Sequence, residues 1–390
     1  MRLSELSARE DVQSATCETL QRHLPSILGA SISVVGDPSA PGQEWRENRL
    51  LSAYHVGVPG NAVARHLRDE FRVTPRRFRA PAQFVVGTLA GTRAGLLLTS
   101  KPAFRIYPPI GDAASWAIVP GNRRVRLFDF AAMRSYSLLK ERYSASTNDA
   151  ELSVRYRAPP GPFPPIVRVG PDRRWFEEPL IDGRSLPRVA GAARRRNALQ
   201  KATAALAQWR AGSVRSVDAT AYSSKLLRII REAASNSHRS ALEPLGPRLL
   251  EMSELWNSLV SRSGEVSLMR THGDFQPGNV LVPRGEGRPL IIDWEYEGER
   301  SQVFDGLTLG LSTRSPTGLR QRTQNWLVNG KLVVGNELLP ALPSPTERAR
   351  AFALFLLEEV VWYIEGLGES ERPSALVSFL DQCPPLQGYS

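Results

Sequence analysis

Three polar side chains in two short stretches have the types and spacing that phosphoryl transfer requires. The first stretch, His272-Gly-Asp-Phe-Gln-Pro-Gly-Asn279, places Asp274 five residues before Asn279. The second, Leu290-Ile-Ile-Asp293-Trp-Glu295, follows after a turn that contains glycine. An aspartate can orient an attacking hydroxyl, while an amide oxygen and a second carboxylate can hold Mg²⁺ against nucleotide phosphates. Asp274 fits the first task, and Asn279 and Asp293 fit the second.

The same residues have a plainer interpretation. A single His-Gly-Asp is common in turns, and an aspartate before an aromatic residue often ends a strand. Both stretches occur in this order, however, and each lies beside a short apolar run, which favours the chemical interpretation. We expect His272 to brace the loop through a hydrogen bond rather than to carry a proton. Gly273 and Gly278 are expected to let the loop fold tightly around phosphates.

The elements that must position these residues form a β-rich part followed by a mostly helical part. Residues 1–80 are predicted to be a partly helical extension of unassigned role, residues 81–180 a β-rich lobe, and residues 181–390 a helical lobe. The expected strands are 115–119, 124–130, 135–140, 164–169 and 174–178, and the clearest expected helices are 61–71, 192–210 and 221–234.

Composition excludes several classes of protein. Apolar residues make up 42% and charged residues 23% of the 390 residues, which is typical of a globular protein. The net charge of +11 divides into +8 on residues 1–180 and +3 on the rest, which suits an anionic ligand, but no basic run is long enough to predict nucleic-acid binding. Cys17 and Cys383 lie too far apart in sequence for a zinc motif. With no apolar stretch of membrane-spanning length and no signal peptide expected, we predict a cytoplasmic protein.

The HGDFQPGNVLV and IIDWE stretches resemble the H-G-D-x-x-x-x-N and I-D-W/F-E signatures of the aminoglycoside phosphotransferase and choline kinase family. The resemblance covers about residues 110–310. It implies an α+β, bilobal, protein-kinase-like fold that binds ATP and Mg²⁺, with Asp274 as the catalytic base and Asn279 and Asp293 as the metal ligands. Trp294-Glu295 stands where protein kinases carry Phe-Gly, and no Ala-Pro-Glu follows, so a small-molecule hydroxyl is the expected acceptor.

The resemblance also implies nucleotide contacts in the β-rich part. Lys140 is the expected cation for the α- and β-phosphates, with Glu151 as its carboxylate partner. Asn148 and Glu151 also have the spacing of a capping box, which would fix a helix start without any catalytic role. Asp305 resembles the family's aspartate after the metal loop, and we expect it to be a helix N-cap.

Two segments complete the expected nucleotide site. The turn at 120–123, with Gly121 and Asn122, is expected to cover the phosphates. The connector at 177–183 resembles the segment whose backbone reads adenine, and Glu178 to Leu180 is its expected position.

The acceptor is argued from charge. Aminoglycosides are polycations that need an acidic pocket; Glu295, Glu297 and Glu299 could supply one, or could form a solvated loop edge. The basic balance of the chain favours a neutral or anionic polyol instead, such as a sugar or an envelope-saccharide intermediate. The alternative is a non-catalytic, kinase-shaped ATP-binding or scaffold protein, which degraded catalytic positions would favour; none is degraded here.

Overall fold

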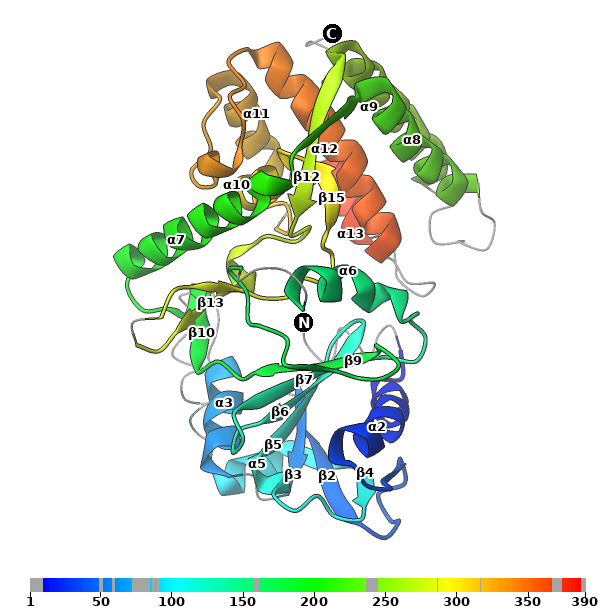
Figure 1. The fold of residues 1–390 in the computed structure, drawn as a ribbon, viewed down its shortest axis with the longest axis vertical. Helices are drawn as coiled ribbons and strands as arrows, with labels where there is room; N and C mark the ends of the chain where they lie inside the picture. Colours follow the sequence, from blue (N-terminus) through cyan, green and yellow to red (C-terminus); the bar gives the residue numbers. More distant parts are fainter. Residues whose placement is uncertain are drawn as a thin grey trace. The chain divides into compact units, whose positions relative to one another are not determined.

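The computed structural model describes residues 10–48, 52–57, 60–71, 85, 88, 92–156, 161–235, 245–285, 287–315, 317–366 and 374–386. The chain divides into two compact units, Met1–Arg188 and Val189–Ser390 (Figure 1).

The described part of the first unit is built on a nine-stranded sheet with the order β1-β4-β2-β3-β5-β6-β7-β9-β8, in which neighbouring strands are antiparallel. The strands are β1 (Ser33–Val35), β2 (Gln43–Asn48), β3 (Ala53–Val56), β4 (Ser100–Tyr107), β5 (Trp116–Pro120), β6 (Arg124–Asp129), β7 (Arg134–Leu139), β8 (Arg168–Val169) and β9 (Trp175–Pro179), followed by β10 (Gly183–Ser185). The helices are α2 (Val12–Leu28), α3 (Asn61–Phe71), α5 (Arg93–Thr99) and α6 (Ser146–Arg155), with short 3₁₀ turns at Ala113–Ser115 and Leu186–Arg188.

The segment that was expected to be a separate extension supplies part of this sheet. Strand β2 lies between β4 and β3, and β3 in turn pairs with β5. The boundary expected at position 80 therefore does not separate two compact units, because β1, β2 and β3 share one sheet with the later strands. The sequence pattern detected only α3 in this region, since strands as short as β1 and β3 carry little periodicity.

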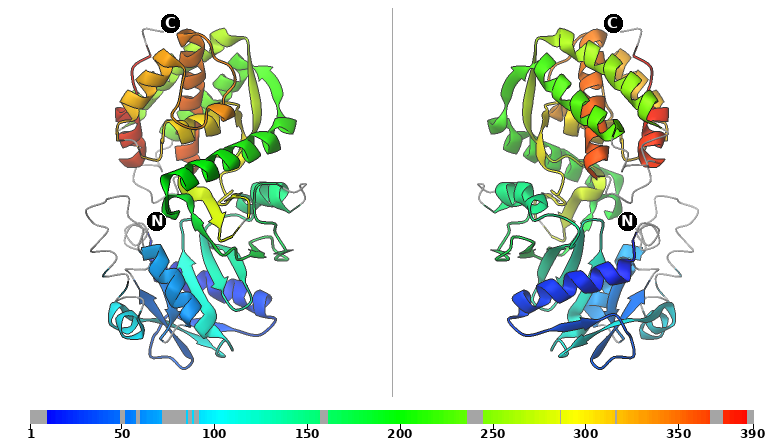
Figure 2. Two further views of the ribbon diagram at one scale, coloured as in Figure 1. Left: turned by 90° about the vertical axis from the view of Figure 1, so that its left-hand side faces the viewer. Right: turned by 90° about the vertical axis from the view of Figure 1, so that its right-hand side faces the viewer.

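Helices cover both faces of the sheet. Leu20 of α2 belongs to one apolar cluster with Trp116 and Ile118 of β5, whereas Leu67 of α3 belongs to another cluster with Ala117. Successive residues of a strand point to opposite faces, so α2 and α3 lie on opposite sides of the sheet. Figure 2 shows α2 on one side of the strands and α3 on the other.

Helix α6 follows β7 and lies on the face away from α2. Leu152 of α6 packs with Phe176 of β9, while the neighbouring Trp175 belongs to the α2 cluster. The same alternation places Lys140, which follows Tyr136 and Leu138 at intervals of two residues, toward the α2 side.

The second unit is mostly helical. Its described elements are α7 (Ala192–Arg210), β11 (Arg215–Asp218), α8 (Ala219–Ser235), α9 (Gly246–Val260), β12 (Glu265–Thr271), β13 (Val280–Pro283), β14 (Leu290–Ile291), β15 (Gly298–Ser301), α10 (Phe304–Gly310), α11 (Leu319–Asn329), α12 (Pro345–Gly366) and α13 (Ser374–Asp381). Short 3₁₀ turns lie at Ala211–Ser213, Ser261–Ser263, Pro277–Asn279 and Asn336–Leu338. A β11-β12-β15 sheet and a β13–β14 hairpin carry the loops discussed below.

The core of this unit surrounds α12. Residues 352–357 of this helix are buried on every side, as its uninterrupted apolar run requires, and α12 packs with α8, α9, α10 and α11. The predicted α+β class, with a β-rich first part and a mostly helical second part, is confirmed. In the described part of the chain, no helix combines the length and the apolar character needed to cross a membrane.

Trp45 tests whether β2 belongs to the core of the first unit. Its side chain is fully buried and stacks on Phe104 of β4, with ring centroids 6.1 Å apart. Replacing Trp45 by Ala should lower the free energy of unfolding by about 3–5 kcal/mol, because a large cavity forms under α2. The control is Leu98→Ala in α5, whose side chain is 87% exposed and whose loss should change stability by no more than about 0.5 kcal/mol. Urea unfolding curves that coincide for the two variants would contradict the assignment of β2 to the core.

Candidate active site

The loop between β12 and β13 holds two of the three residues that the sequence singled out. Strand β12 ends at Thr271, and the 3₁₀ turn Pro277–Asn279 leads directly into β13. The β13–β14 pairing continues one residue past the strands, since the Ile292 N–H donates to the Asn279 carbonyl at 2.9 Å. The hairpin therefore brings Asp293, the next residue, to the end of the loop that carries Asp274.

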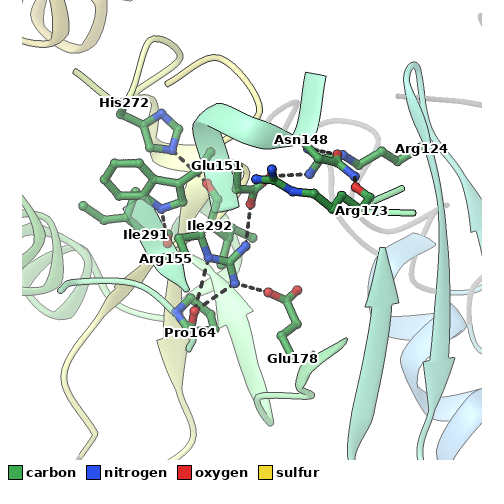
Figure 3. Close-up of polar contacts among 11 residues, drawn as sticks. Arg124, Asn148, Glu151, Arg155, Pro164, Arg173, Glu178, His272, Ile291 and Ile292 are labelled. Atoms are coloured by element: carbon green, nitrogen blue, oxygen red, sulfur yellow. Dashed lines mark hydrogen bonds and ion pairs between the residues drawn. The ribbon is translucent and has the colours of Figure 1, made fainter. Parts of the chain in front are cut away.

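His272 ties the loop to the same strand end. Its ring Nδ1 accepts a hydrogen bond from the Asp274 N–H at 3.2 Å, so Nε2 is the donor to the Ile292 carbonyl at 3.0 Å (Figure 3). The ring is fully buried and meets the Trp294 ring edge-on, 4.7 Å between centroids. An imidazole with both nitrogens engaged braces the loop, in agreement with the bracing role expected from the sequence.

Asp305 holds the beginning of the loop. Its carboxylate accepts from the backbone N–H groups of His272, at 2.9 Å, and Gly273, at 3.1 Å. The N-cap role expected for Asp305 is wrong: the N-cap of α10 is Val303, and Asp305 lies inside the first turn, fully buried. The physical reason is that two buried amides from a distant part of the sequence need an acceptor, which no local pattern reveals.

Arg210 of α7 balances the Asp305 charge. Its Nη1 lies 3.7 Å from the Asp305 carboxylate, and the side chain is buried. Burial lowers the pKa of Arg210, and the carboxylate of Asp305 opposes that shift.

Gly273 adopts a backbone conformation that other residues disfavour. Its φ is +82°, and a Cβ at this position would lie 2.0 Å from the Tyr296 carbonyl oxygen. Glycine is therefore required here for both conformation and space. Gly278 differs: it has no left-handed φ and nothing within 4 Å of its would-be Cβ, so the protein itself does not require glycine there, and its expected approach to phosphates stays a prediction.

The Asp274 carboxylate is held from several sides within the loop. Its Oδ2 accepts from Gln276 Nε2 at 2.9 Å and from Asn279 Nδ2 at 3.0 Å. The Asn279 amide nitrogen also donates to the Asp274 carbonyl, 2.9 Å away. Because the amide nitrogen of Asn279 is used in the loop, its side-chain oxygen is the atom left to act as a metal ligand.

Asp293 has a φ of +72°, an uncommon value for a residue other than glycine. Such conformations are costly and gather at functional positions. Within the ranges that the structure describes, no three His, Cys, Asp or Glu side chains cluster closely enough to bind a metal unaided. Mg²⁺ at a nucleotide needs only one or two protein ligands, since phosphates and water complete its octahedron. The oxygen donors of Asn279 and Asp293 fit this chemistry.

Two residues that sequence reasoning missed complete the surroundings of Asp274. Arg314 donates from Nε to Asp274 Oδ1 at 2.6 Å and from Nη2 to the Gly273 carbonyl at 3.3 Å, and its Nη1 pairs with Glu359 of α12. Its guanidinium lies over the Trp362 ring, 3.6 Å from the centroid. Arg314 and Glu359 are both distant from Asp274 in sequence, so no local spacing could reveal these contacts.

The residues for which the sequence predicts nucleotide contacts lie in the first unit. Lys140 directly follows β7; its side chain is 2% exposed and its ammonium pairs with Glu10, the residue before the N-cap of α2. Glu10 also pairs with Arg142 at 3.2 Å. A lysine this buried requires a carboxylate nearby, and Glu10 supplies it.

Glu151 has different partners from those expected. Both of its carboxylate oxygens are engaged, one by Arg124 of β6 and the other by Arg155 of α6 (Figure 3). Burial alone would raise the pKa of Glu151, but Arg124 and Arg155 lower it to about 2. The expected Lys140–Glu151 pairing is thus wrong, because α6 lies on the face of the sheet away from Lys140. Arg155 also binds Glu178, so this carboxylate too belongs to an ion-pair network.

The expected capping box at the start of α6 is also wrong. Asn148 lies inside the helix, which begins at Ser146, and Ala145 occupies the N-cap position. The Asn148 amide instead accepts from Arg124 and donates to the Arg173 carbonyl, at 2.9 Å and 2.8 Å.

The expected phosphate turn and adenine connector are formed by backbone contacts. The β5–β6 turn closes through a 2.7 Å hydrogen bond from the Gly121 N–H to the Arg124 carbonyl, and Asn122 lies within it. The Lys140 N–H donates to the Arg123 carbonyl at 2.9 Å, which places the backbone of Lys140 beside this turn. In the connector, the Leu180 N–H donates to the Met133 carbonyl at 2.9 Å.

Comparison with known proteins identifies the part of the chain that carries the loop. The model of the phosphotransferase enzyme family matches residues 173–316, which include Asp274, Asn279, Asp293 and Arg314. This match confirms the resemblance found in the sequence. No curated protein sequence matches the chain.

Three of the solved structures that match the chain are each named as a kinase or a phosphotransferase. An ethanolamine kinase from Plasmodium vivax is 11% identical, with 85% of this chain and 96% of that chain covered and a TM-score of 0.44. A thermostable mutant of the aminoglycoside phosphotransferase APH(4)-Ia is 13% identical, with 70% and 88% covered and a TM-score of 0.38. A glucosamine kinase in complex with glucosamine, ADP and inorganic phosphate is 14% identical, with 69% and 70% covered and a TM-score of 0.27. At these identities and TM-scores, the similarities do not identify an acceptor.

The two loop glycines provide a matched pair of substitutions. Gly273→Ala should lower the free energy of unfolding by at least about 1–3 kcal/mol, because the new Cβ is strained at positive φ and meets the Tyr296 carbonyl. Gly278→Ala places its Cβ in open space and should change stability little. Thermal and urea unfolding of both variants check the difference. Equal stability of the two would show that the loop does not have this conformation.

Proposed function

Because residues 173–316 match the phosphotransferase enzyme family, we propose that the chain is a kinase that transfers the γ-phosphoryl group of ATP to a hydroxyl of a small molecule. The observation that carries the proposal is the joint position of Asp274, Asn279 and Asp293. Asn279 contacts the Asp274 carboxylate, and the hairpin pairs Asn279 with the residue before Asp293, which supports a shared role for the three side chains.

The reaction assigns one task to Asp274. Its carboxylate accepts the hydrogen bond of the acceptor hydroxyl and receives the proton as the oxygen attacks. A bond forms between the acceptor oxygen and the γ-phosphorus, the bond to the bridging oxygen breaks, and ADP leaves. Gln276 and Asn279 fix the direction of the carboxylate through their hydrogen bonds to Oδ2.

Asn279 and Asp293 are the proposed holders of Mg²⁺. When bound, this ion neutralises charge on the β- and γ-phosphates. The asparagine offers its side-chain oxygen because its amide nitrogen is committed to Asp274. Asp293 has a φ that is rare for a residue other than glycine, and such strained conformations occur mostly at functional positions, which supports its proposed role as a Mg²⁺ ligand.

Lys140 remains the proposed cation for the phosphates, with Glu10 as its partner in place of Glu151. Its backbone meets the β5–β6 turn, which supports a common phosphate site with Gly121 and Asn122. A phosphate oxygen would bind the Lys140 ammonium either together with the Glu10 carboxylate or in place of it. In the connector, the carbonyl of Leu180 is the proposed contact to adenine.

A neutral or anionic polyol is the proposed class of acceptor. The acidic edge that could attract a polycation is weakened, since both carboxylate oxygens of Glu299 are bound by Arg215. That contact also lowers the pKa of Glu299. The alternative is a non-catalytic ATP-binding protein. A turnover assay distinguishes the two, because only a kinase transfers phosphate to an acceptor.

Substitutions of the proposed residues should separate binding from catalysis. Asp274→Asn keeps the size of the side chain but removes the proton acceptor, so transfer to the true acceptor should fall by ~10²–10⁴-fold while Mg²⁺-ATP affinity is kept. Asp293→Asn and Lys140→Met should instead weaken Mg²⁺-dependent ATP binding. Calorimetric titration with ATP, with and without Mg²⁺, measures the affinities. A screen of hydroxylated metabolites for the mass gain of one phosphoryl group measures transfer.

Two results would contradict the proposal. If the Asp274→Asn variant turned over at the wild-type rate, the His-Gly-Asp stretch would have no catalytic role and would be only a turn. Equal stabilisation of the wild type by ATP with Mg²⁺ and with excess EDTA would exclude the metal assignment, because a ligand stabilises the folded state only through binding. ATP binding without transfer to any metabolite would favour the scaffold alternative.

A further inference from the structure

Arg314 lies between two acidic side chains that come from separate elements. Asp274 belongs to the loop after β12, and Glu359 belongs to α12, where it is fully buried. The guanidinium contacts both carboxylates and lies over the Trp362 ring of α12, 3.6 Å from the ring centroid. The cluster lies within the second unit and is formed by segments that are distant from one another in sequence.

The contact fixes the one atom of the Asp274 carboxylate that the loop leaves without a donor. Oδ2 accepts hydrogen bonds from the side-chain amides of Gln276 and Asn279, and Oδ1 accepts one from Arg314 Nε at 2.6 Å. With donors on both oxygens, the plane of the carboxylate is set. Each carboxylate oxygen has two lone pairs and Oδ1 uses one of them for Arg314, so an acceptor hydroxyl can still bind to Oδ1.

The arginine itself is held firmly. Burial opposes its charge, but Glu359 and Asp274 raise the pKa of Arg314 above its usual range. It is thus a permanent cation, pinned by Glu359 on one side, by the Gly273 carbonyl on another and by the Trp362 ring on its face. Burial raises the pKa of Glu359, so this carboxylate also depends on Arg314 as its counter-ion.

We propose that Arg314 is the positioning residue for Asp274, and that its guanidinium fills the place beside Asp274 that an ammonium group of an acceptor would take. The inference rests on the proposed function of Asp274. Two carboxylates and an aromatic face make a site for a cation. Because the chain fills this site with its own cation, the acceptor hydroxyl must come from a part of the substrate that is neutral or anionic.

The test compares Arg314→Ala and Arg314→Lys with Arg320→Ala. Arg320 lies on α11, is exposed, and donates to the Asp381 carbonyl, so its substitution removes an arginine without touching Asp274. Calorimetry gives the Mg²⁺-ATP affinity, and ATP turnover is measured with the best acceptor of the metabolite screen and with water alone. Millimolar guanidinium is then added as a probe. If Arg314→Ala fails to fold, Arg314→Ala with Glu359→Gln removes the unpaired buried charge as well.

The expected result is a fall in turnover of ~10²-fold in Arg314→Ala at unchanged Mg²⁺-ATP affinity, since misplacing a reacting group costs about this factor. Guanidinium should raise the melting temperature of this variant and restore part of its rate, but should do neither for the wild type or Arg320→Ala. The turnover of Arg314→Lys should lie between those of the wild type and Arg314→Ala, because an ammonium keeps the positive charge but cannot bridge both carboxylates in the same plane.

Wild-type turnover in Arg314→Ala, a parallel loss of nucleotide affinity, or no response to guanidinium would overturn the inference. Failure of the proposed function looks different. In that case the wild type itself neither binds Mg²⁺-ATP nor turns it over, and the role of Arg314 falls with it.

Discussion

The geometry of the candidate site depends on one buried carboxylate that accepts two backbone N–H groups. Asp305 binds the amides of His272 and Gly273, and so fixes the first two residues of the loop. Two further constraints follow from this anchor: the left-handed Gly273 against the Tyr296 carbonyl, and the His272 ring that reaches Ile292. An unpaired buried amide is costly, so the loop cannot leave this arrangement without losing both hydrogen bonds together.

Charge balance is the second requirement of this region. Asp274, Asp305 and Glu359 are buried carboxylates, and each has an arginine within ion-pair distance. Buried ion pairs add little net stability, but removing one partner is strongly destabilising. Such pairs hold a fixed arrangement of side chains, which is what orienting an acceptor hydroxyl demands. The arginines come from α7 and from the segment after α10: Arg314 contacts Asp274 directly, whereas Arg210 pairs with Asp305, which anchors the start of the same loop.

Features set by neighbouring residues, such as helix bounds and a short hairpin, could be predicted from the sequence. Contacts between residues distant in the sequence could not. The bounds of α3 and α7 follow from periodicity and are recovered as Asn61–Phe71 and Ala192–Arg210. The neighbouring positions of Asn279 and Asp293 could also be anticipated, because one short hairpin joins them.

Pairings between distant residues could not be read from the sequence. The partner of Lys140 is Glu10, near the start of the chain, and Arg314 reaches Asp274 from beyond the β13–β14 hairpin and α10. Chain order favours a Lys140–Glu151 pair because α6 is the next element after β7, but the face on which α6 packs is set by the whole sheet. Chain order likewise favours a cap role for Asp305, because an aspartate early in a helix has a local use that hides a distant one.

Hydrogen exchange at the two anchored amides tests the central claim most directly. In the wild type, the His272 and Gly273 amides should exchange as slowly as Leu268 and Met269 of the adjacent strand β12. Asp305→Asn keeps the size of the side chain but replaces one of the two acceptor oxygens by a donor. We predict that at least one of the two loop amides then exchanges rapidly while the β12 amides stay protected. Unchanged protection of both His272 and Gly273 in this variant would contradict the account.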